Sequence, residues 1–344
     1  MVNPTDEVLT NYRHLIETRR ELAEKEVEVA DETRTRDGTR ITLLSNINLL
    51  SDLEAAERFK AEGVGLYRSE FPFLVRADFP SEEEQFRIYS RICEKSGEKE
   101  VTFRTLDVGG DKILPYHQQE DEEMNPFLGM RGIRFSLRYP IIFCQQLRAL
   151  LRAGHGRVLN IMFPMVTSLD DFLDAKGIVN ECIYELQQEG VPHNSQPNLG
   201  VMIEVPSAVE VVNELAEEVQ FLSIGTNDLI QYMLAVDRTN QNVADLYINF
   251  HPAVLRAMNK VADAAIRNDI TLSICGKMAT DPHMLAFLLG IGIKKLSVAP
   301  RSIPQVQNTI KELHIEDAHF AARKMLGYGE ISEIVEFLKT HVTG

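Results

Sequence analysis

The sequence has little that would mark a secreted, membrane-spanning or metal-stapled protein. Its four cysteines are scattered and show no C-x-x-C spacing, so neither a disulfide framework nor a zinc site is expected. No apolar run approaches the length of a membrane span, and the amino terminus lacks the shape of a signal peptide. The sequence therefore predicts a cytoplasmic protein without membrane insertion.

Basic residues are also scarce. The chain has 36 lysines and arginines against 51 aspartates and glutamates, which gives a formal net charge of −15. This balance argues against a nucleic-acid or anionic-membrane partner, so an anionic substrate would have to be held by local arginines. The 344 residues and the 44% hydrophobic content are those of a folded globular chain with one large domain or two ordinary ones.

Short apolar strands alternate with helical stretches from residue 37 onward. We expect eight strands, at 41–48, 63–70, 101–108, 158–165, 199–206, 221–228, 271–279 and 295–299. Each is followed by a helix, which is typical of a (β/α)8 TIM barrel and, as the alternative, of a doubly wound open sheet. A glycine-rich dinucleotide signature is absent, because Gly63 and Gly65 precede their strand instead of opening a helix. The barrel is therefore predicted.

The first 36 residues differ from the rest of the chain. Residues 5–36 have the pattern of a long polar helix with only a narrow apolar stripe, which is more typical of an arm than of a core element. A turn at 36–39 marks the expected boundary. We predict a helical linker or arm at 1–36 and the barrel at 37–344.

Arginines stand near the carboxyl ends of two predicted strands, where a barrel collects its functional residues. Arg68 and Arg104 lie in otherwise apolar strands, and two guanidinium groups at one mouth suit a carboxylate or phosphate. The structural alternative is ion pairing with Glu70 and Asp107. Further arginines follow in later loops: Arg131, Arg134 and Arg238. Their number favours ligand binding.

The stretch 221–238 holds a carboxylamide, a carboxylate and a guanidinium on one strand–turn–helix unit. Asp228 is expected at the end of strand six and Glu204 at the end of strand five, next to it. Neighbouring strands lie about 5 Å apart, so the two carboxylates can share a hard cation. A site that offers only a few protein oxygens and leaves coordination positions open suits Mg²⁺. The alternative is that both carboxylates are paired with the arginines.

Two further features lie at predicted strand ends. Cys275 ends strand seven just before Gly276, where a thiol could give or take a proton, whereas the other three cysteines have the pattern of small core residues. The loop that ends in Lys112 resembles a phosphate-binding turn, although GGDK also fits an ordinary turn.

Seven sequence blocks occur in an order that resembles one family. They are GVGLYRSEF, FRTLDVGGDKILPY, NPFLGMRGIR, IMFPMVTSLDD, VMIEVPSA, SIGTNDLIQYMLAVDR and CGKMATDP. From about residue 37 to the end, the chain resembles the carboxyl-terminal phosphoenolpyruvate-binding domain of Enzyme I, the phosphoenolpyruvate–protein phosphotransferase of the bacterial phosphotransferase system. FPSEEEQ, FHPAVLRAM and APRSIP lean toward its nitrogen-regulatory branch. Pyruvate phosphate dikinase and phosphoenolpyruvate synthase are more distant resemblances.

The resemblance implies a (β/α)8 barrel that forms a homodimer and binds phosphoenolpyruvate with Mg²⁺. The family's substrate-binding residues match Arg68, Arg104, Asn227, Asp228 and Arg238. Its metal ligands match Glu204 and Asp228. The acid that protonates the methylene carbon as pyruvate forms matches Cys275. Further positive groups of the pocket match Lys112 and Arg131.

The chain departs from the family in two respects. None of its nine histidines has the Thr-Ser-His context of the family's phosphoryl acceptor, so the resemblance implies a separate phosphohistidine domain and an HPr-like carrier protein as partners. Lys277 and Thr280 stand where the family commonly has glutamate and glycine. We hypothesise that the cation of Lys277 lowers the pKa of the Cys275 thiol.

Three functions are consistent with the sequence. The chain is predicted first to be the catalytic part of an Enzyme I-type phosphotransferase. The alternative is a phosphoenolpyruvate-sensing dimerisation module without catalysis of its own. The third is a free-standing lyase of the barrel superfamily that acts on pyruvate or oxaloacetate.

Overall fold

A computed structural model of the chain describes residues 29–76, 78–109 and 124–341. One compact unit begins at Asp31. It opens with a short strand, β1 (Thr33–Arg34), which pairs antiparallel with β2 (Arg40–Ile47). The prediction of a helix up to residue 36 is therefore wrong for residues 29–36, because this segment forms a hairpin with the first barrel strand. The rest of that predicted helix lies outside the described residues.

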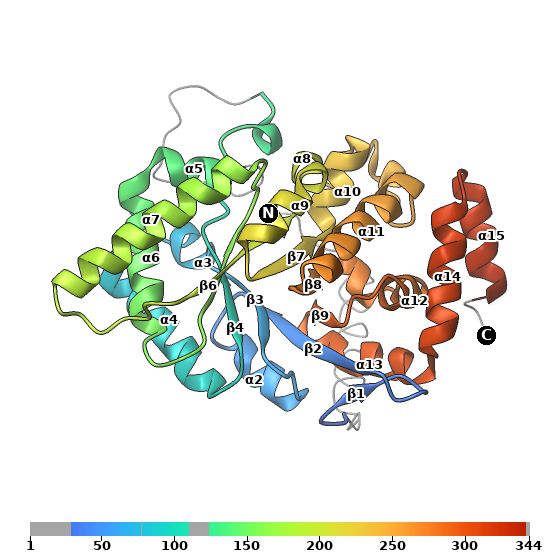
Figure 1. The fold of residues 1–344 in the computed structure, drawn as a ribbon, viewed down its shortest axis with the longest axis horizontal. Helices are drawn as coiled ribbons and strands as arrows, with labels where there is room; N and C mark the ends of the chain where they lie inside the picture. The colour runs from blue at the N-terminus through green and yellow to red at the C-terminus, as the bar shows by residue number, and fades with distance from the viewer. Residues whose placement is uncertain (1–28, 77, 110–123, 342–344) are drawn as a thin grey trace, which may run out of the picture. The chain divides into compact units, whose positions relative to one another are not determined.

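Eight parallel strands close into a barrel, as the sequence predicts. They follow one another in chain order, and the barrel closes where β2 pairs with β9 (Figure 1). After β2, the strands are β3 (Val64–Arg68), β4 (Val101–Arg104), β5 (Asn160–Phe163), β6 (Asn198–Ile203), β7 (Phe221–Gly225), β8 (Thr271–Cys275) and β9 (Lys295–Val298).

Helices surround the barrel and follow its strands, as the predicted alternation requires (Figure 1). In the first half they are α2 (Asp52–Arg58), α3 (Phe71–Leu74), α4 (Glu82–Ser96), α5 (Ile133–Arg138), α6 (Pro140–Ala153) and α7 (Leu169–Gln188). In the second half they are α8 (Pro206–Glu210), α9 (Val212–Glu218), α10 (Thr226–Leu234), α11 (Pro252–Arg267), α12 (Pro282–Gly290), α13 (Ile303–Glu312), α14 (Ile315–Gly327) and α15 (Ile331–His341). Within the described part of the chain, no helix combines the length and the hydrophobicity needed to cross a membrane.

The strands are shorter than the apolar runs suggest, and this shifts two predicted site residues. The strand predicted at 221–228 ends at Gly225, and α10 begins at Thr226 without an intervening turn. Asn227 and Asp228 therefore lie in the first turn of a helix and not at the end of a strand. Periodicity misses this boundary because Ile224 and Leu229 are both buried and continue an apolar pattern.

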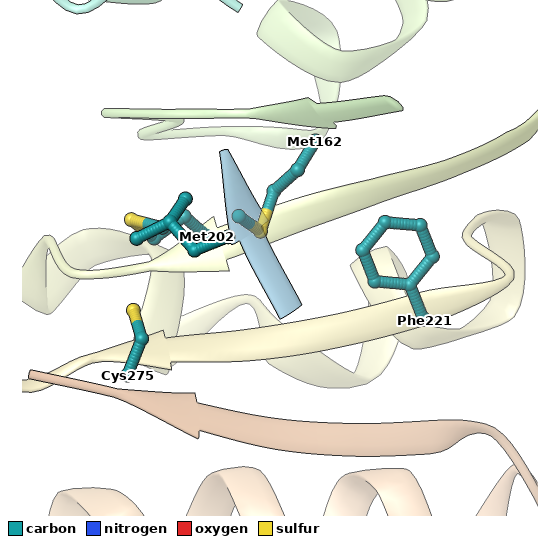
Figure 2. Packing of buried hydrophobic residues seen from close by; sticks show 5 residues of the cluster. Met162, Met202, Phe221 and Cys275 are labelled. Carbon is teal, nitrogen blue, oxygen red and sulfur yellow. The ribbon is translucent and has the colours of Figure 1, made fainter. Parts of the chain in front are cut away.

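Side chains from several strands fill the barrel interior. One buried cluster joins Leu66, Met162, Met202, Phe221 and Cys275. In Figure 2, Phe221 and Cys275 stand at opposite ends of this row with the two methionines between them. Because the interior is packed in this way, ligand chemistry is confined to the ends of the barrel.

Candidate active site at the carboxyl mouth of the barrel

Arg68 and Arg104 meet at the carboxyl ends of adjacent strands. They are register partners in the β3–β4 pair, so the two arginines lie side by side as the sequence predicts. Arg68 is half-buried and its Nη1 donates to Asn48 Oδ1 at 3.4 Å. One side of the mouth therefore carries two positive charges.

Arg104 is buried among carboxylates. Its Nη2 pairs with Glu70 Oε1 and lies 3.1 Å from Asp107 Oδ2. Desolvation works to lower the pKa of Arg104, but the carboxylates of Glu70 and Asp107 outweigh it and the pKa is raised. The structural alternative from the sequence, pairing with these two acids, is therefore present. Its Nε is buried and has no hydrogen-bond partner among the described residues, so this N–H group is available to a ligand.

Arg131 lies in a loop, as predicted, but its side chain is buried and pairs with two carboxylates. Its side chain is only 1% exposed. Its Nε and Nη2 donate to the two carboxylate oxygens of Asp107 at 3.0 and 3.2 Å. Its Nη1 donates to Asp228 Oδ1 at 3.2 Å and to Tyr232 Oη at 2.9 Å. This one guanidinium therefore links the loop before α5 to helix α10.

Tyr232 is a part of the site that the sequence analysis missed. Its hydroxyl accepts from Arg131 and donates to the carbonyl oxygen of Phe127 at 2.6 Å. A signal was present, since Tyr232 follows Asp228 by one helical turn and such residues share a helix face. This spacing predicts a role for Tyr232 only if the helix is known to begin at Thr226.

Glu204 lies buried at the end of β6, facing Asp228. Its Oε1 accepts from the backbone nitrogen of Met165 at 2.8 Å. Burial, together with the negative charges of Asp228 and Asp107, raises the pKa of Glu204 to about 8. The two predicted metal ligands therefore lie close enough to repel each other, as strand adjacency indicated.

Met165 holds Glu204 from an unusual backbone conformation. It has a φ of +58°, in the left-handed region that non-glycine residues seldom adopt. Such strain persists where the surrounding structure enforces it, often at functional sites. The sequence places Met165 at a strand end, but side-chain patterns give no signal for a role carried by a backbone nitrogen.

The carboxylates fit a magnesium ion that keeps part of its own hydration. Within the described ranges, no group of three or more His, Cys, Asp and Glu side chains is arranged for a metal. Two carboxylates are nevertheless enough for Mg²⁺, which commonly takes its other oxygens from water and phosphate. Glycine at 225 leaves room beside Glu204, because a Cβ there would lie 2.7 Å from Oε2. The mutual repulsion of Glu204 and Asp228 is what a divalent cation relieves.

Cys275 is a buried thiol whose charged surroundings include Glu204, Arg68 and Arg104. It pairs in register with Gly225, the residue before α10, and is 4% exposed. Burial raises the pKa of its thiol to about 11, against the smaller effect of Arg68. Lys277 is exposed and is not among the main causes of this net upward shift, so the hypothesis that its charge lowers the pKa of Cys275 stays a prediction.

Asn227 and Arg238 complete the part of the site that the structure brings together. Asn227 Oδ1 accepts from the backbone nitrogen of Lys277 at 3.2 Å, which joins the start of α10 to the segment after Cys275. Arg238 Nη2 lies 3.7 Å from Asp228 Oδ1, and its side chain is 25% exposed. Arg238 thus reaches back over the mouth from the loop after α10.

Two further cations were predicted near this group, Lys112 and Arg134. Lys112 lies outside the described residues. Arg134 is directed to its own loop, where it donates to the carbonyl oxygens of Leu128 and Gly129, both at 3.1 Å. These contacts stabilise the loop, and ligand binding by Arg134 stays a prediction.

The fold and the mouth define a class of protein: a TIM barrel whose carboxyl end combines buried arginines with two acidic residues suited to a divalent cation. The family model described as "PEP-utilising enzyme, PEP-binding domain" matches residues 21–315. The chain belongs to this family.

Curated relatives agree with this assignment. The chain is 42% identical over 342 residues to a phosphoenolpyruvate-protein phosphotransferase of Bacillus sp. (strain S), an alignment that covers 98% of the chain and 59% of the relative. A protein of Salmonella typhimurium named phosphoenolpyruvate-dependent phosphotransferase system is 40% identical over 328 residues, which are 95% of the chain and 44% of the relative. The chain thus spans less than two thirds of the length of these relatives. Their names do not separate the sugar branch from the nitrogen-regulatory branch, which stays a prediction.

A solved structure supports the fold alone. A citrate lyase from Burkholderia xenovorans superimposes with a TM-score of 0.52 at 16% sequence identity, covering 83% of this chain and 81% of that one. At this identity the likeness concerns the barrel and not its chemistry.

Proposed function

We propose that this chain binds phosphoenolpyruvate together with Mg²⁺ and supports transfer of its phosphoryl group to a histidine on a separate domain, releasing pyruvate. This is the first step of a bacterial phosphotransferase system. The observation that carries the proposal is the meeting of Arg68 and Arg104 in register at the same mouth as Glu204 and Asp228. The family membership and the names of the relatives support it.

Substrate binding follows from the charges of the mouth. Phosphoenolpyruvate carries a carboxylate and a phosphate, and guanidinium groups bind both through charge-assisted hydrogen bonds. Arg68 and Arg238 are partly accessible, and Arg104 retains an unpartnered Nε. In the proposal these three arginines hold the anion and Asn227 contacts it from the start of α10.

Glu204 and Asp228 would hold the Mg²⁺ ion. When bound, the ion supplies positive charge to the phosphoryl oxygens, which phosphoryl transfer generally requires. The protein's own contribution is a rigid frame, because Glu204 is fixed by the nitrogen of Met165 and Asp228 by helix α10. We propose that this frame positions the phosphoryl group at the opening of the barrel, where an acceptor histidine can reach it.

Cys275 is the proposed acid for the three-carbon product. As the bond between phosphorus and the enol oxygen breaks, electron density is left on the enolate. Transfer of the thiol proton to the methylene carbon then gives pyruvate and leaves a thiolate. A pKa near 11 keeps the thiol protonated at neutral pH, and the charges of Arg68 and Arg104 favour the thiolate that forms.

Calorimetric titration tests the binding part of this proposal. We expect phosphoenolpyruvate to bind the wild-type chain in the presence of Mg²⁺, with affinity reduced at least tenfold without the ion. Glu204→Ala and Asp228→Ala should abolish the Mg²⁺ dependence. Wild-type protein that binds no phosphoenolpyruvate, or binding indifferent to both substitutions, would contradict the site assignment.

Addition of a phosphohistidine domain and an HPr-like carrier protein tests the transfer part. Phosphorylation of the histidine domain that is lost in Arg104→Ala would support the phosphotransferase. Binding without any transfer would support the sensing module, and pyruvate release without a protein acceptor would support the lyase. A homodimer and a cytoplasmic location belong to the same proposal, and gel filtration with light scattering tests the former.

A further inference from the structure

Asp107 occupies the centre of the charged network at the carboxyl mouth. Its side chain has no solvent exposure. Its Oδ1 accepts from Arg131 Nε at 3.0 Å, and its Oδ2 lies 3.2 Å from Arg131 Nη2 and 3.1 Å from Arg104 Nη2. A carboxylate that binds the side edge of a guanidinium at two points fixes the plane of that group. The position of Arg131 therefore depends on Asp107.

The same guanidinium also reaches the carboxylate assigned to the metal. Arg131 Nη1 lies 3.2 Å from Asp228 Oδ1. Arg131 is thus shared between two acids, one that takes two of its nitrogens and one that takes the third. A divalent cation that binds Asp228 Oδ1 would have to compete with this guanidinium for that oxygen.

We propose that Asp107 is a positioning residue that retains Arg131 and thereby keeps Asp228 available to the divalent cation; the inference rests on the metal site of the proposed function. A buried guanidinium that loses one carboxylate partner turns to those that remain, because an uncompensated buried charge is costly. Among the residues that the structure describes, the carboxylate left to Arg131 would be Asp228. The arginine would then take the place of the metal.

A simpler explanation must be separated from this one. Asp107 is itself negative, so its loss would weaken cation binding through space even if Arg131 did not move. The two explanations differ in their dependence on Arg131. A direct charge effect is the same whether or not Arg131 is present, whereas a positioning effect disappears with the arginine. A double-mutant cycle measures this difference.

The experiment measures Mn²⁺ binding by electron paramagnetic resonance of the free ion, with Mn²⁺ as a probe for the Mg²⁺ site. The proteins are the wild type, Asp107→Asn, Arg131→Gln and the double variant. We expect Asp107→Asn alone to weaken Mn²⁺ binding by tenfold or more. Arg131→Gln should bind the ion at least as tightly as wild type, and adding Asp107→Asn to it should change the affinity by less than threefold.

Each other result overturns the inference in a recognisable way. Equal weakening by Asp107→Asn in both backgrounds would show a direct charge effect, and no weakening in either would show that Asp107 is irrelevant to the ion. If Asp107→Asn does not fold, as judged by circular dichroism, Arg131→Gln decides alone, because a tenfold loss of affinity there would show that Arg131 supports the ion. Wild-type protein that binds no Mn²⁺ would instead reject the metal site of the proposed function itself.

Discussion

The two ends of the barrel are built from the same strands but hold charge in different ways. The carboxyl mouth buries arginines and carboxylates in one connected network: Arg104, Arg131, Glu70, Asp107, Glu204 and Asp228. At the amino mouth, a cavity of about 180 Å³ is lined mainly by hydroxyl and amide side chains, including Thr102, Asn160, Asn198 and Gln220. Its ion pair, Lys295 with Glu100 at 2.9 Å, is partly exposed.

The two ends therefore differ in what stabilises their charged side chains. Neighbouring charges do so at the carboxyl mouth, and water contributes at the amino mouth. In the carboxyl network each group is compensated only by its neighbours, because solvent is excluded. At the amino mouth, water screens the pair and satisfies either member when the other is lost. We therefore expect equal chemical changes to have unequal effects at the two ends.

Arg104→Ala should have the largest effect. It removes the buried guanidinium that pairs with both Glu70 and Asp107, which costs about 3–5 kcal/mol of unfolding free energy for this type of network. Urea denaturation followed by circular dichroism measures the loss, and calorimetry should show that phosphoenolpyruvate binding is abolished. The matched control is Lys295→Ala at the amino mouth, with an expected cost below about 1 kcal/mol. Similar costs for the two variants would remove the distinction between the mouths.

Gly225→Ala should have the next largest effect. It tests the space available at the carboxyl mouth, whereas Arg104→Ala tests charge. The new Cβ would lie 2.7 Å from Glu204 Oε2, and relief of that contact must move the carboxylate that is proposed to hold the metal. We expect a loss of roughly 1–3 kcal/mol together with weaker Mn²⁺ binding.

A glycine on the outer helices provides the control for this substitution. Gly177 lies within α7 and nothing is within 4 Å of the position that its Cβ would take. Gly177→Ala should therefore stabilise the chain by about 0.5–1 kcal/mol, since alanine is favoured over glycine inside a helix. A destabilisation by Gly177→Ala as large as that by Gly225→Ala would show that the effect is not specific to the mouth.

Much of the architecture could be predicted from the sequence because the strands are continuous apolar runs separated by helical stretches. The adjacency of the strands that carry Arg68 and Arg104 follows from that alternation, because chain order fixes which strands are adjacent in a barrel. The same adjacency brings Glu204, at the end of β6, near Asp228, at the start of the helix that follows β7.

The parts that could not be predicted depend on three-dimensional burial. Arg131 looks like one loop arginine among several, and only its depth shows that it is shared by Asp107 and Asp228. Met165 contributes a backbone nitrogen from a strained conformation, for which residue type gives no signal. The raised pKa of Cys275 has the same origin, because the sequence shows which charges lie nearby in the chain but not how deeply the sulfur is buried.

The pH dependence of stability should be a smaller effect and should involve the carboxyl mouth. The folded chain holds the proton of Glu204 more tightly than the unfolded chain, with a pKa of about 8 against 4.5. This contribution is therefore complete below pH 4.5 and is lost as pH rises toward 8. Between pH 6 and pH 9 we expect wild type to lose on the order of 2 kcal/mol more than Glu204→Gln, by urea denaturation without Mg²⁺. Parallel profiles for the two proteins would contradict the burial of a titrating carboxyl group at this site.

The smallest expected effect concerns the pKa of Cys275, which should not change when Lys277 is replaced. Its pKa is raised to about 11 mainly by burial, and Lys277 is exposed to water, where its charge is screened. Lys277→Glu should therefore leave the pKa of Cys275 unchanged within about 0.3 units, since one unit corresponds to about 1.4 kcal/mol of differential interaction. Thiolate absorbance, taken as the difference from Cys275→Ser, isolates this sulfur from the other cysteines. A rise of one unit or more in Lys277→Glu would support the original hypothesis, because it would show that the lysine charge reaches the buried thiol. An unchanged value would mean that Lys277 leaves the proposed acid intact, and that depth in the barrel sets the protonation of the thiol.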